Sequence, residues 1–246
     1  MKSICIMRKA RDVRFIASLK VVGTRIEGDR IPLVANEGDV RAIGIVKAAN
    51  LPWTALAPEP LDNTIRTHLW VRGAETVIEL KGSESIETTE LELAARIASY
   101  VQAQGDVNLI AVGETEQDSG RRLLPALLAA ELGWNVVRGV TSLEIVGDIA
   151  KLKLDTDTKA ELDVQLPVLI VANESASLGG DPSDKFDLIE KFEKTPAQLV
   201  STNAVLHAQP KLMGIELPPS RKTQVVCPLK DDEVIQVIEQ LLAVKG

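Results

Sequence analysis

The sequence is poor in the residue types that form most metal and nucleophilic sites. Its only cysteines are Cys5 and Cys227, and its only histidines are His68 and His207. Both cysteines lie in apolar runs without a metal or redox spacing, which favours buried free thiols. Two isolated histidines argue against a multi-histidine metal site, and we interpret His68 as a packed or surface residue. Neither a Gly-x-Ser-x-Gly nor a Gly-Lys-Ser/Thr motif is present, so we predict no catalytic residue and no metal ligand.

Aromatic residues and long apolar runs are also scarce. Aromatics make up 3% of the 246 residues, so the core has to be built from Val, Ile, Leu and Ala. No apolar run approaches the roughly 20 residues that span a bilayer, and no signal peptide is evident. We therefore expect no membrane insertion and a cytoplasmic location, or an organelle matrix after processing. The net charge of −7 argues against nucleic acid as a partner.

The most informative segment that is present combines an apolar run, a polar loop and an apolar helix. An apolar run at residues 107–112 ends at Gly113, and its part 109–112 has no polar alternation, which is typical of a strand buried on both faces of a parallel sheet. The following loop leads into a predicted helix that ends near Trp134. Unpaired N–H groups and the helix dipole favour an anion at such a helix start, and doubly wound folds hold nucleotide phosphates there.

Strands and helices alternate through the first half of the chain, which predicts an α/β fold with a parallel sheet and right-handed crossovers. A β-hairpin is expected in residues 14–35. The other predicted strands are 3–7, 51–57, 74–80 and 107–112, and the predicted helices are 39–49, 61–71 and 85–104.

After Trp134 the pattern changes to short strands with short connections. Residues 135–137, 142–146 and 151–154 read as strands of an antiparallel extension, and the run 166–171 either completes it or returns to the sheet. The C-terminal part contains a turn-rich stretch and three further expected elements, namely a helix at 187–192, an extended linker at 217–222 and an amphipathic helix at 231–244. We predict a nucleotide-binding α/β domain in residues 1–172 and a docking loop with a C-terminal arm, packing on a partner or on the core, in residues 173–246.

Four motifs, in order along the chain, resemble those of electron transfer flavoprotein beta subunits. They are Asn63–Thr67 after Ala57-Pro58, Asp118–Trp134, Leu166–Ala172 and Pro218–Arg221. The stretch Cys5–Arg8 with Asp12, and Asn36 before a helix, match the family's N-terminal pattern more loosely.

The resemblance implies an adenine-nucleotide α-hydrolase-like (Rossmann-like) domain with a β-hairpin insertion and a C-terminal extension. It also implies a heterodimer with an electron transfer flavoprotein alpha subunit, which holds most of the FAD, while AMP or a second FAD binds to this chain. Such a pair is an electron carrier rather than a stand-alone enzyme. Its donors are acyl-CoA or other dehydrogenases, and its acceptor is a quinone oxidoreductase or another protein. A regulatory nucleotide-binding module of the same fold, without redox activity, is the alternative.

The resemblance assigns cofactor binding to residues at the ends of three strands and at two helix starts. These are Ile6, Arg8, Asn36, Leu56, Ala57, Gly113, Asp118, Ser119, Gly120, Arg121, Arg122, Leu123 and Leu124.

Three departures from the family pattern bear on function. The phosphate-facing turn lacks the usual Gln and carries Arg121 and Arg122, which are either phosphate donors or a solvated helix edge. The turn-rich stretch at 174–186 lacks the family's aromatic and arginine, so docking of the dehydrogenase is expected to differ. Val13 and Gly38 replace bulkier side chains that approach the partner's flavin. The pocket therefore holds AMP, holds a second FAD, or is empty or remodelled.

Overall fold

The computed structural model describes residues 2–12, 32–81, 89–117, 119–155 and 159–202. All of them belong to the first of two compact units, residues 1–207. The described strands are β1 (Lys2–Ile6), β2 (Lys9–Arg11), β3 (Leu33–Ala35), β4 (Trp53–Ala57), β5 (Thr76–Leu80), β6 (Val107–Gly113), β7 (Asn135–Val146), β8 (Ile149–Asp155), β9 (Lys159–Gln165), β10 (Val168–Ala172) and β11 (Gln198–Val200). The described helices are α2 (Glu37–Ala48), α3 (Asn63–Val71), α4 (Glu90–Gln104), α5 (Leu124–Leu132) and α6 (Lys185–Phe192).

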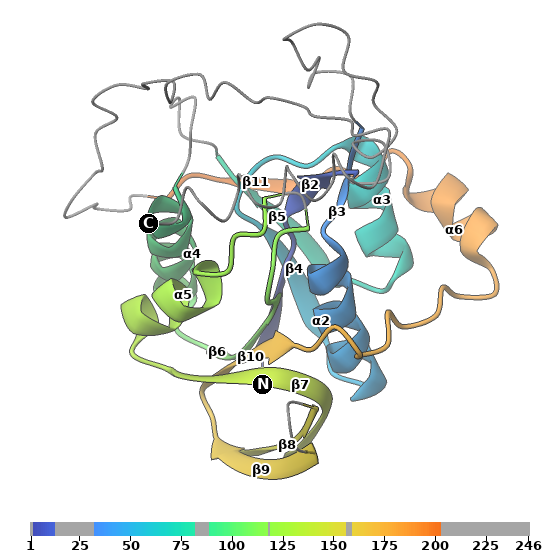
Figure 1. Cartoon of the computed structure of the whole chain (residues 1–246). Coiled ribbons are helices and arrows are strands. Elements are labelled where there is room, and N and C mark those ends of the chain that lie inside the picture. Colours follow the sequence, from blue (N-terminus) through green and yellow to red (C-terminus); the bar gives the residue numbers. More distant parts are fainter. Residues whose placement is uncertain (1, 13–31, 82–88, 118, 156–158, 203–246) are drawn as a thin grey trace, which may run out of the picture. The chain divides into compact units, whose positions relative to one another are not determined.

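One nine-stranded sheet organises this unit, in the order β11-β5-β4-β1-β6-β10-β7-β8-β9 (Figure 1). Strands from β11 to the first half of β7 are parallel, and β7, β8 and β9 form an antiparallel extension at one side. The strand β1 lies between β4 and β6, and the chain runs outward from it in both directions. This reversal of strand order is the place where α/β sheets open a crevice at the carboxyl ends of their strands.

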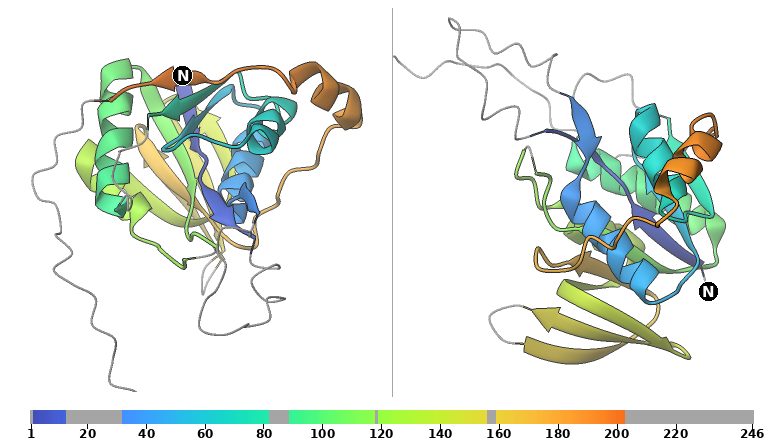
Figure 2. Two further views of the ribbon diagram at one scale, coloured as in Figure 1. Left: turned by 90° about the horizontal axis from the view of Figure 1, so that it is seen from above. Right: turned by 90° about the vertical axis from the view of Figure 1, so that its right-hand side faces the viewer.

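Helices cover both faces of the parallel part, as the two views of Figure 2 show. The helices α2 and α3 pack on one face and α4 and α5 on the other. Neighbouring residues of each strand point to opposite faces, so Cys5 joins the α2/α3 core while Ile4 and Ile6 join the α4/α5 core. A strand covered on both sides has no reason to alternate polar and apolar residues, which explains the unbroken apolar runs in the sequence.

The predicted elements of the parallel part are confirmed within a few residues. Asn36 directly precedes α2, as its position before a predicted helix indicated. The strand β3 falls within the predicted hairpin of residues 14–35, but it pairs antiparallel with β2, which precedes that range. The first strand and the turn of the predicted hairpin lie outside the described residues. The linker at 217–222 and the helix at 231–244 also lie outside the described residues.

The extension differs from the prediction in two respects. Residues 135–137 and 142–146 belong to one strand, β7, which changes partner from β10 to β8 near Gly139, a residue with a φ of 77°. The strand β9 was not predicted, because every one of its residues is exposed or half-buried and the charged edge position gives no apolar pattern. The run at 166–171 is the returning parallel strand β10, inserted between β6 and β7.

Candidate functional site

A crevice lies at the carboxyl ends of β1, β4 and β6. The segments that follow these strands line a cavity of about 300 Å³, to which Arg8, Pro58 and Arg121 each contribute. It stands where the strand order reverses, at the position that α/β sheets use for ligands. The volume falls at the lower end of the range of roughly 300–1,000 Å³ for small-molecule sites.

One of the residues that line this crevice, Arg8, belongs to a buried ion pair. The Arg8 side chain follows β1, and Asp39 lies in the first turn of α2, with 3% and 0% of their surfaces exposed. Arg8 donates to Asp39 from its backbone N, its Nε and its Nη2, at 2.9, 3.0 and 2.8 Å. The amide of Gly113 donates to Asp39 Oδ1 at 2.8 Å, and Arg8 Nη2 also donates to the carbonyl oxygen of Gly113 at 2.8 Å. Asp39 therefore joins the ends of β1 and β6 to the start of α2.

The guanidinium of Arg8 stays charged in this setting. Burial alone lowers the pKa of Arg8, but the carboxylates of Asp39, Glu116 and Glu90 raise it above its ordinary value. Its Nη1 is buried and has no hydrogen-bond partner among the described residues. A buried donor without a partner costs free energy, so the site favours an anionic or acceptor group next to Arg8.

A close backbone contact holds α2 against the end of β6. A Cβ atom on Gly113 would lie 2.3 Å from the carbonyl carbon of Gly38, closer than any side chain allows. A Cβ on Gly38 would in turn lie 3.2 Å from the Gly113 Cα. The two glycines let the start of α2 approach β6, which brings Asp39 within reach of Arg8. The small residue at position 38 thus fills a packing role in this chain.

Asn36 fastens the loop that follows β6. Its side chain donates to the carbonyl oxygen of Thr115 at 3.0 Å and accepts from the amide of Gln117 at 3.0 Å. The loop closes on itself further on, because Glu116 and Arg121 are joined through their backbones at 3.0 Å and Ser119 Oγ donates to Glu116 Oε2 at 2.6 Å. Arg121 is held at the cavity wall by these contacts.

The cavity has an excess of positive charge. Its ionisable lining residues are the cations Arg8, Lys9, Arg11 and Arg121 and the carboxylates Glu59 and Glu116. Lys9 lies 3.7 Å from Glu59, a distance at which an exposed pair is weak. Arginine side chains are well suited to phosphate oxygens because their donors form a planar fork. The lining fits a small anionic ligand such as a nucleotide phosphate.

The structure brings together some of the sequence-predicted site residues in this cavity and separates others from it. Arg8, Ser119 and Arg121 line it. Ile6, Leu56 and Leu124 are buried in the core between the sheet and α4/α5, and Ala57 is buried on the other face, so these residues offer backbone atoms only.

The remaining predicted residues support the loop or lie at its outer side. Asn36 and Gly113 act through the contacts described above. Gly120, with a φ of 69°, forms the turn of the loop and lines a neighbouring hollow of about 310 Å³ beside α2. Arg122 is exposed and Leu123 is 62% exposed. Asp118 and Val13 lie outside the described residues.

Sequence reasoning missed the residue that organises the crevice, Asp39. The available signal was a carboxylate three residues after Asn36 in an otherwise apolar-faced helix, together with Arg8 directly after a buried strand. It also missed Glu90, whose carboxylate accepts from the amides of Leu123 and Leu124 at 3.0 Å each. Nothing in the local sequence connects the start of α4 with the start of α5.

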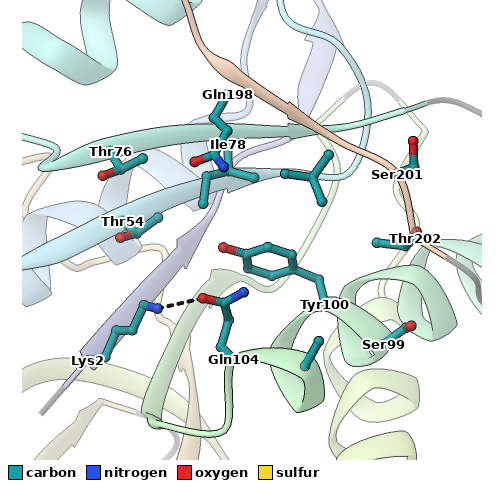
Figure 3. A pocket seen from close by; sticks show the side chains of 12 residues that line it. Lys2, Thr54, Thr76, Ile78, Ser99, Tyr100, Gln104, Gln198, Ser201 and Thr202 are labelled. Carbon is teal, nitrogen blue, oxygen red and sulfur yellow. Dashed lines mark hydrogen bonds between the residues drawn. The ribbon is translucent and has the colours of Figure 1, made fainter.

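A second, larger cavity lies at the opposite edge of the sheet. It has a volume of about 520 Å³ and is lined mainly by hydroxyl and amide side chains, among them those of Thr54, Tyr100 and Gln198 (Figure 3). Among its described lining residues is the cation Lys2, which donates to Gln104 Oε1 at 2.8 Å and lies 3.3 Å from Asp106. Because its charge is already paired and it lies at the amino ends of β1, β4 and β5, we do not choose it as the site.

Residues 42–178 match the electron transfer flavoprotein domain family. The match covers more than half of the chain, and the chain belongs to this family. No curated protein sequence matches it significantly. The mixed sheet with its antiparallel extension is the adenine nucleotide α-hydrolase-like fold that the resemblance implied.

Membership of this family implies association with a flavin or nucleotide and with a partner subunit. Among the described residues, no group of three or more His, Cys, Asp or Glu side chains is arranged to hold a metal ion. No helix in the described ranges is long and apolar enough to cross a membrane.

Proposed function

We propose that this chain is the beta-type subunit of an electron transfer flavoprotein heterodimer and that it binds the adenine nucleotide of AMP in the crevice after β1, β4 and β6. The observation that carries the proposal is the cationic cavity at the strand-order reversal of an electron transfer flavoprotein domain. An alpha subunit would hold most of the FAD, and the redox chemistry would be supplied by that flavin. This chain would contribute a nucleotide clamp and one wall of the flavin site.

The residues present fit a nucleotide. Arg121, Lys9 and the buried Arg8 would hold phosphate oxygens through charge-assisted hydrogen bonds. The backbone after β1 and β4, at Met7 and Pro58, would border the base and ribose. A cavity of about 300 Å³ suits one nucleotide better than a whole FAD, which favours AMP over a second FAD in this chain.

A dehydrogenase would dock on the segment between β10 and the end of α6. Lys47 of α2 and Arg72, directly after α3, hold this segment by its carbonyl oxygens. Arg72 donates to the carbonyl of Leu178 at 2.8 Å, and Lys47 donates to that of Gly180 at 3.2 Å. No residue of α6 is buried, and Phe186 is 83% exposed. A backbone fastened in this way leaves apolar side chains directed away from the core, where a partner protein can contact them.

Native purification tests the proposal. A flavin-bearing subunit of related fold should co-purify with the chain, and denaturing the complex should release one FAD and one AMP per heterodimer. Two FAD molecules would support the bifurcating alternative instead. A homogeneous, colourless protein that releases another nucleotide and never recruits a flavin subunit would favour the regulatory module, which the altered turn at Arg121 and Arg122 also suits.

A further inference from the structure

We propose that the cavity at the amino ends of β1, β4 and β5 is a second binding site, which takes an uncharged polyhydroxylated ligand such as a sugar. This site lies at the opposite ends of the strands from the nucleotide crevice and is independent of the proposed function. Its volume of about 520 Å³ lies within the range of roughly 300–1,000 Å³ for small-molecule sites.

The cavity opens where one face of the sheet changes from apolar to polar. Leu56 of β4 and Ile78 of β5 belong to the core beneath α4 and α5. Because side chains two positions apart on a strand point to the same face, Thr54 and Thr76 continue that face towards the amino ends of the strands. The two threonines are direct neighbours in the parallel pairing of β4 with β5, and both line the cavity. The fold therefore places a pair of hydroxyl groups where a covered sheet would otherwise carry core residues.

The hydroxyl groups of Thr54 and Tyr100 are available to a ligand. The two residues line the cavity and are 7% and 5% exposed. No hydrogen bond joins either hydroxyl to a described residue, yet neither oxygen is among the fully buried polar atoms that lack a partner. Each oxygen therefore keeps surface open to the cavity, and Figure 3 shows Tyr100 extending across it from α4. Polar groups in such a setting gain stability from a hydrogen-bond partner that enters the cavity.

The lining favours a ligand without charge. Among the residues that the structure describes along this cavity, only Lys2 is charged at neutral pH, and its ammonium group is already engaged by Gln104 and Asp106. Burial, followed by the nearby Asp106, raises the pKa of Tyr100, so its phenol stays neutral. An ionic ligand would thus lose its hydration without meeting an unpaired opposite charge.

The side chains around the cavity suit a ligand that both donates and accepts hydrogen bonds. They come from separate elements, with Thr54 on β4, Tyr100 on α4 and Gln198 on β11. A hydroxyl group donates and accepts through one oxygen, and the glutamine amide does so through its nitrogen and its oxygen. The hydroxyl groups of a sugar have the same double capacity. The ring of Tyr100 adds an apolar surface beside its polar hydroxyl, which suits the mixed C–H and O–H surface of a sugar ring.

The test uses D-glucose, D-ribose and myo-inositol as probes. Tyr100 is the only tyrosine of the chain, so selective ¹³C labelling of tyrosine gives NMR signals that report on this cavity alone. In the full chain, by itself or with an unlabelled partner subunit, at least one probe should shift these signals saturably at millimolar concentrations. Glucose 6-phosphate should bind no more tightly than glucose, because the described lining has no unpaired cation.

Variants that lose a single hydroxyl group identify the contacts. Thr54→Val and Tyr100→Phe keep the shape of the side chain, and each should weaken binding of the probe about fivefold in calorimetry, as loss of one hydrogen bond does. Thr64→Val is the matched control, because Thr64 is an exposed residue of α3, which packs on the other face of the sheet. Its affinity should equal that of wild type, and thermal unfolding verifies that all three variants are folded.

Several results would overturn the second site. They are Tyr100 signals that do not move with any probe, shifts that grow in proportion to concentration without saturation, and equal affinities in wild type, Thr54→Val and Tyr100→Phe. Much tighter binding of glucose 6-phosphate than of glucose would show that the ligand is an anion. AMP is titrated separately, since failure of AMP to bind counts against the nucleotide crevice and leaves the glucose result unaffected.

Discussion

The cavities at the carboxyl ends and at the amino ends of the strands differ in volume and in the burial of their charged residues. The crevice at the carboxyl ends has a volume of about 300 Å³ and is lined by Arg8, which forms a buried ion pair with Asp39. The cavity at the amino ends has a volume of about 520 Å³ and is lined by Lys2, which pairs with the exposed Asp106. The smaller cavity is the one in which the fold maintains a charge out of water, at a cost that only several hydrogen bonds offset. Buried and oriented charge, rather than volume, is therefore the reason for proposing the carboxyl-end crevice as the nucleotide site.

The largest expected effect is on stability, and it should differ between the Arg8–Asp39 and Lys2–Asp106 ion pairs. Asp39→Asn removes a carboxylate that accepts four hydrogen bonds and leaves Arg8 buried and unpaired, so we expect a loss of about 3–5 kcal/mol in the free energy of unfolding. Asp106→Asn, at a residue that is 67% exposed, should cost about 0–1 kcal/mol. Denaturant unfolding of both variants measures this difference, and equal losses would show that the crevice pair has no special role.

A smaller effect is expected from the backbone contact under the crevice. Gly113→Ala places a methyl group 2.3 Å from the Gly38 backbone, which cannot move without displacing α2, so we expect destabilisation by about 1–3 kcal/mol or more. Gly180→Ala is the matched control, because nothing lies within 4 Å of its Cβ position. Thermal unfolding compares the two, and a stable Gly113→Ala protein would show that α2 is not held by this contact.

Variants with substitutions in the two cavities should differ in their affinity for AMP. Arg121→Ala removes a cation from the lining of the crevice and should weaken AMP binding about tenfold, as loss of a charge-assisted hydrogen bond does. Arg122→Ala and Lys2→Ala should change the affinity little, because Arg122 is not among the lining residues and Lys2 lies at the other edge. Titration calorimetry measures all three. A larger effect of Lys2→Ala would move the site to the amino-end cavity.

The smallest expected effect is a shift in the pKa of Tyr100 at the amino-end cavity. Tyr100 is the only tyrosine of the chain, and burial, followed by the nearby Asp106, raises its pKa above 10.0. The folded state therefore favours the neutral phenol, and this contribution to stability is present below about pH 10 and is lost as the pH rises above the unfolded-state value. The tyrosinate absorbance should titrate at higher pH in the folded chain than in denaturant, and Asp106→Asn should reduce the difference. Equal midpoints would contradict the burial of this side chain.

Sequence reasoning predicted the parallel half of the fold better than the extension. The runs at 51–57 and 107–112 each predict a strand, because a short segment with apolar residues on both faces is stable in a sheet that is covered on both sides. The strand β9 gives no such signal, since its charged side chains remain in water on pairing. The change of partner within β7 at Gly139 was equally invisible, because it depends on where β10 enters the sheet.

In the candidate site, too, some residues could be predicted from the sequence and others could not. Arg8, Ser119 and Arg121 could be named from the sequence because the resemblance to electron transfer flavoprotein beta subunits assigned cofactor binding to their positions, and all three line one cavity. Asp39 and Glu90 could not be assigned a role, since each acts on a segment more than 30 positions away along the chain. The neighbouring arginines Arg121 and Arg122 were indistinguishable in sequence, and only the closed loop after β6 separates them.

The sequence by itself determined the class of fold, because the pattern of apolar and polar residues and the alternation of strands with helices are local properties of the chain. It also predicted that a ligand would bind where the strand at 107–112 leads into the following helix. The tertiary structure alone decided which charges meet there. Whether a carboxylate pairs with Arg8 or covers the start of α5 depends on distances between segments far apart in sequence, and electrostatic energies change steeply with distance and burial. The sequence specifies the charged residues, and the packing of the chain determines which of these charges are paired with other residues of the same chain.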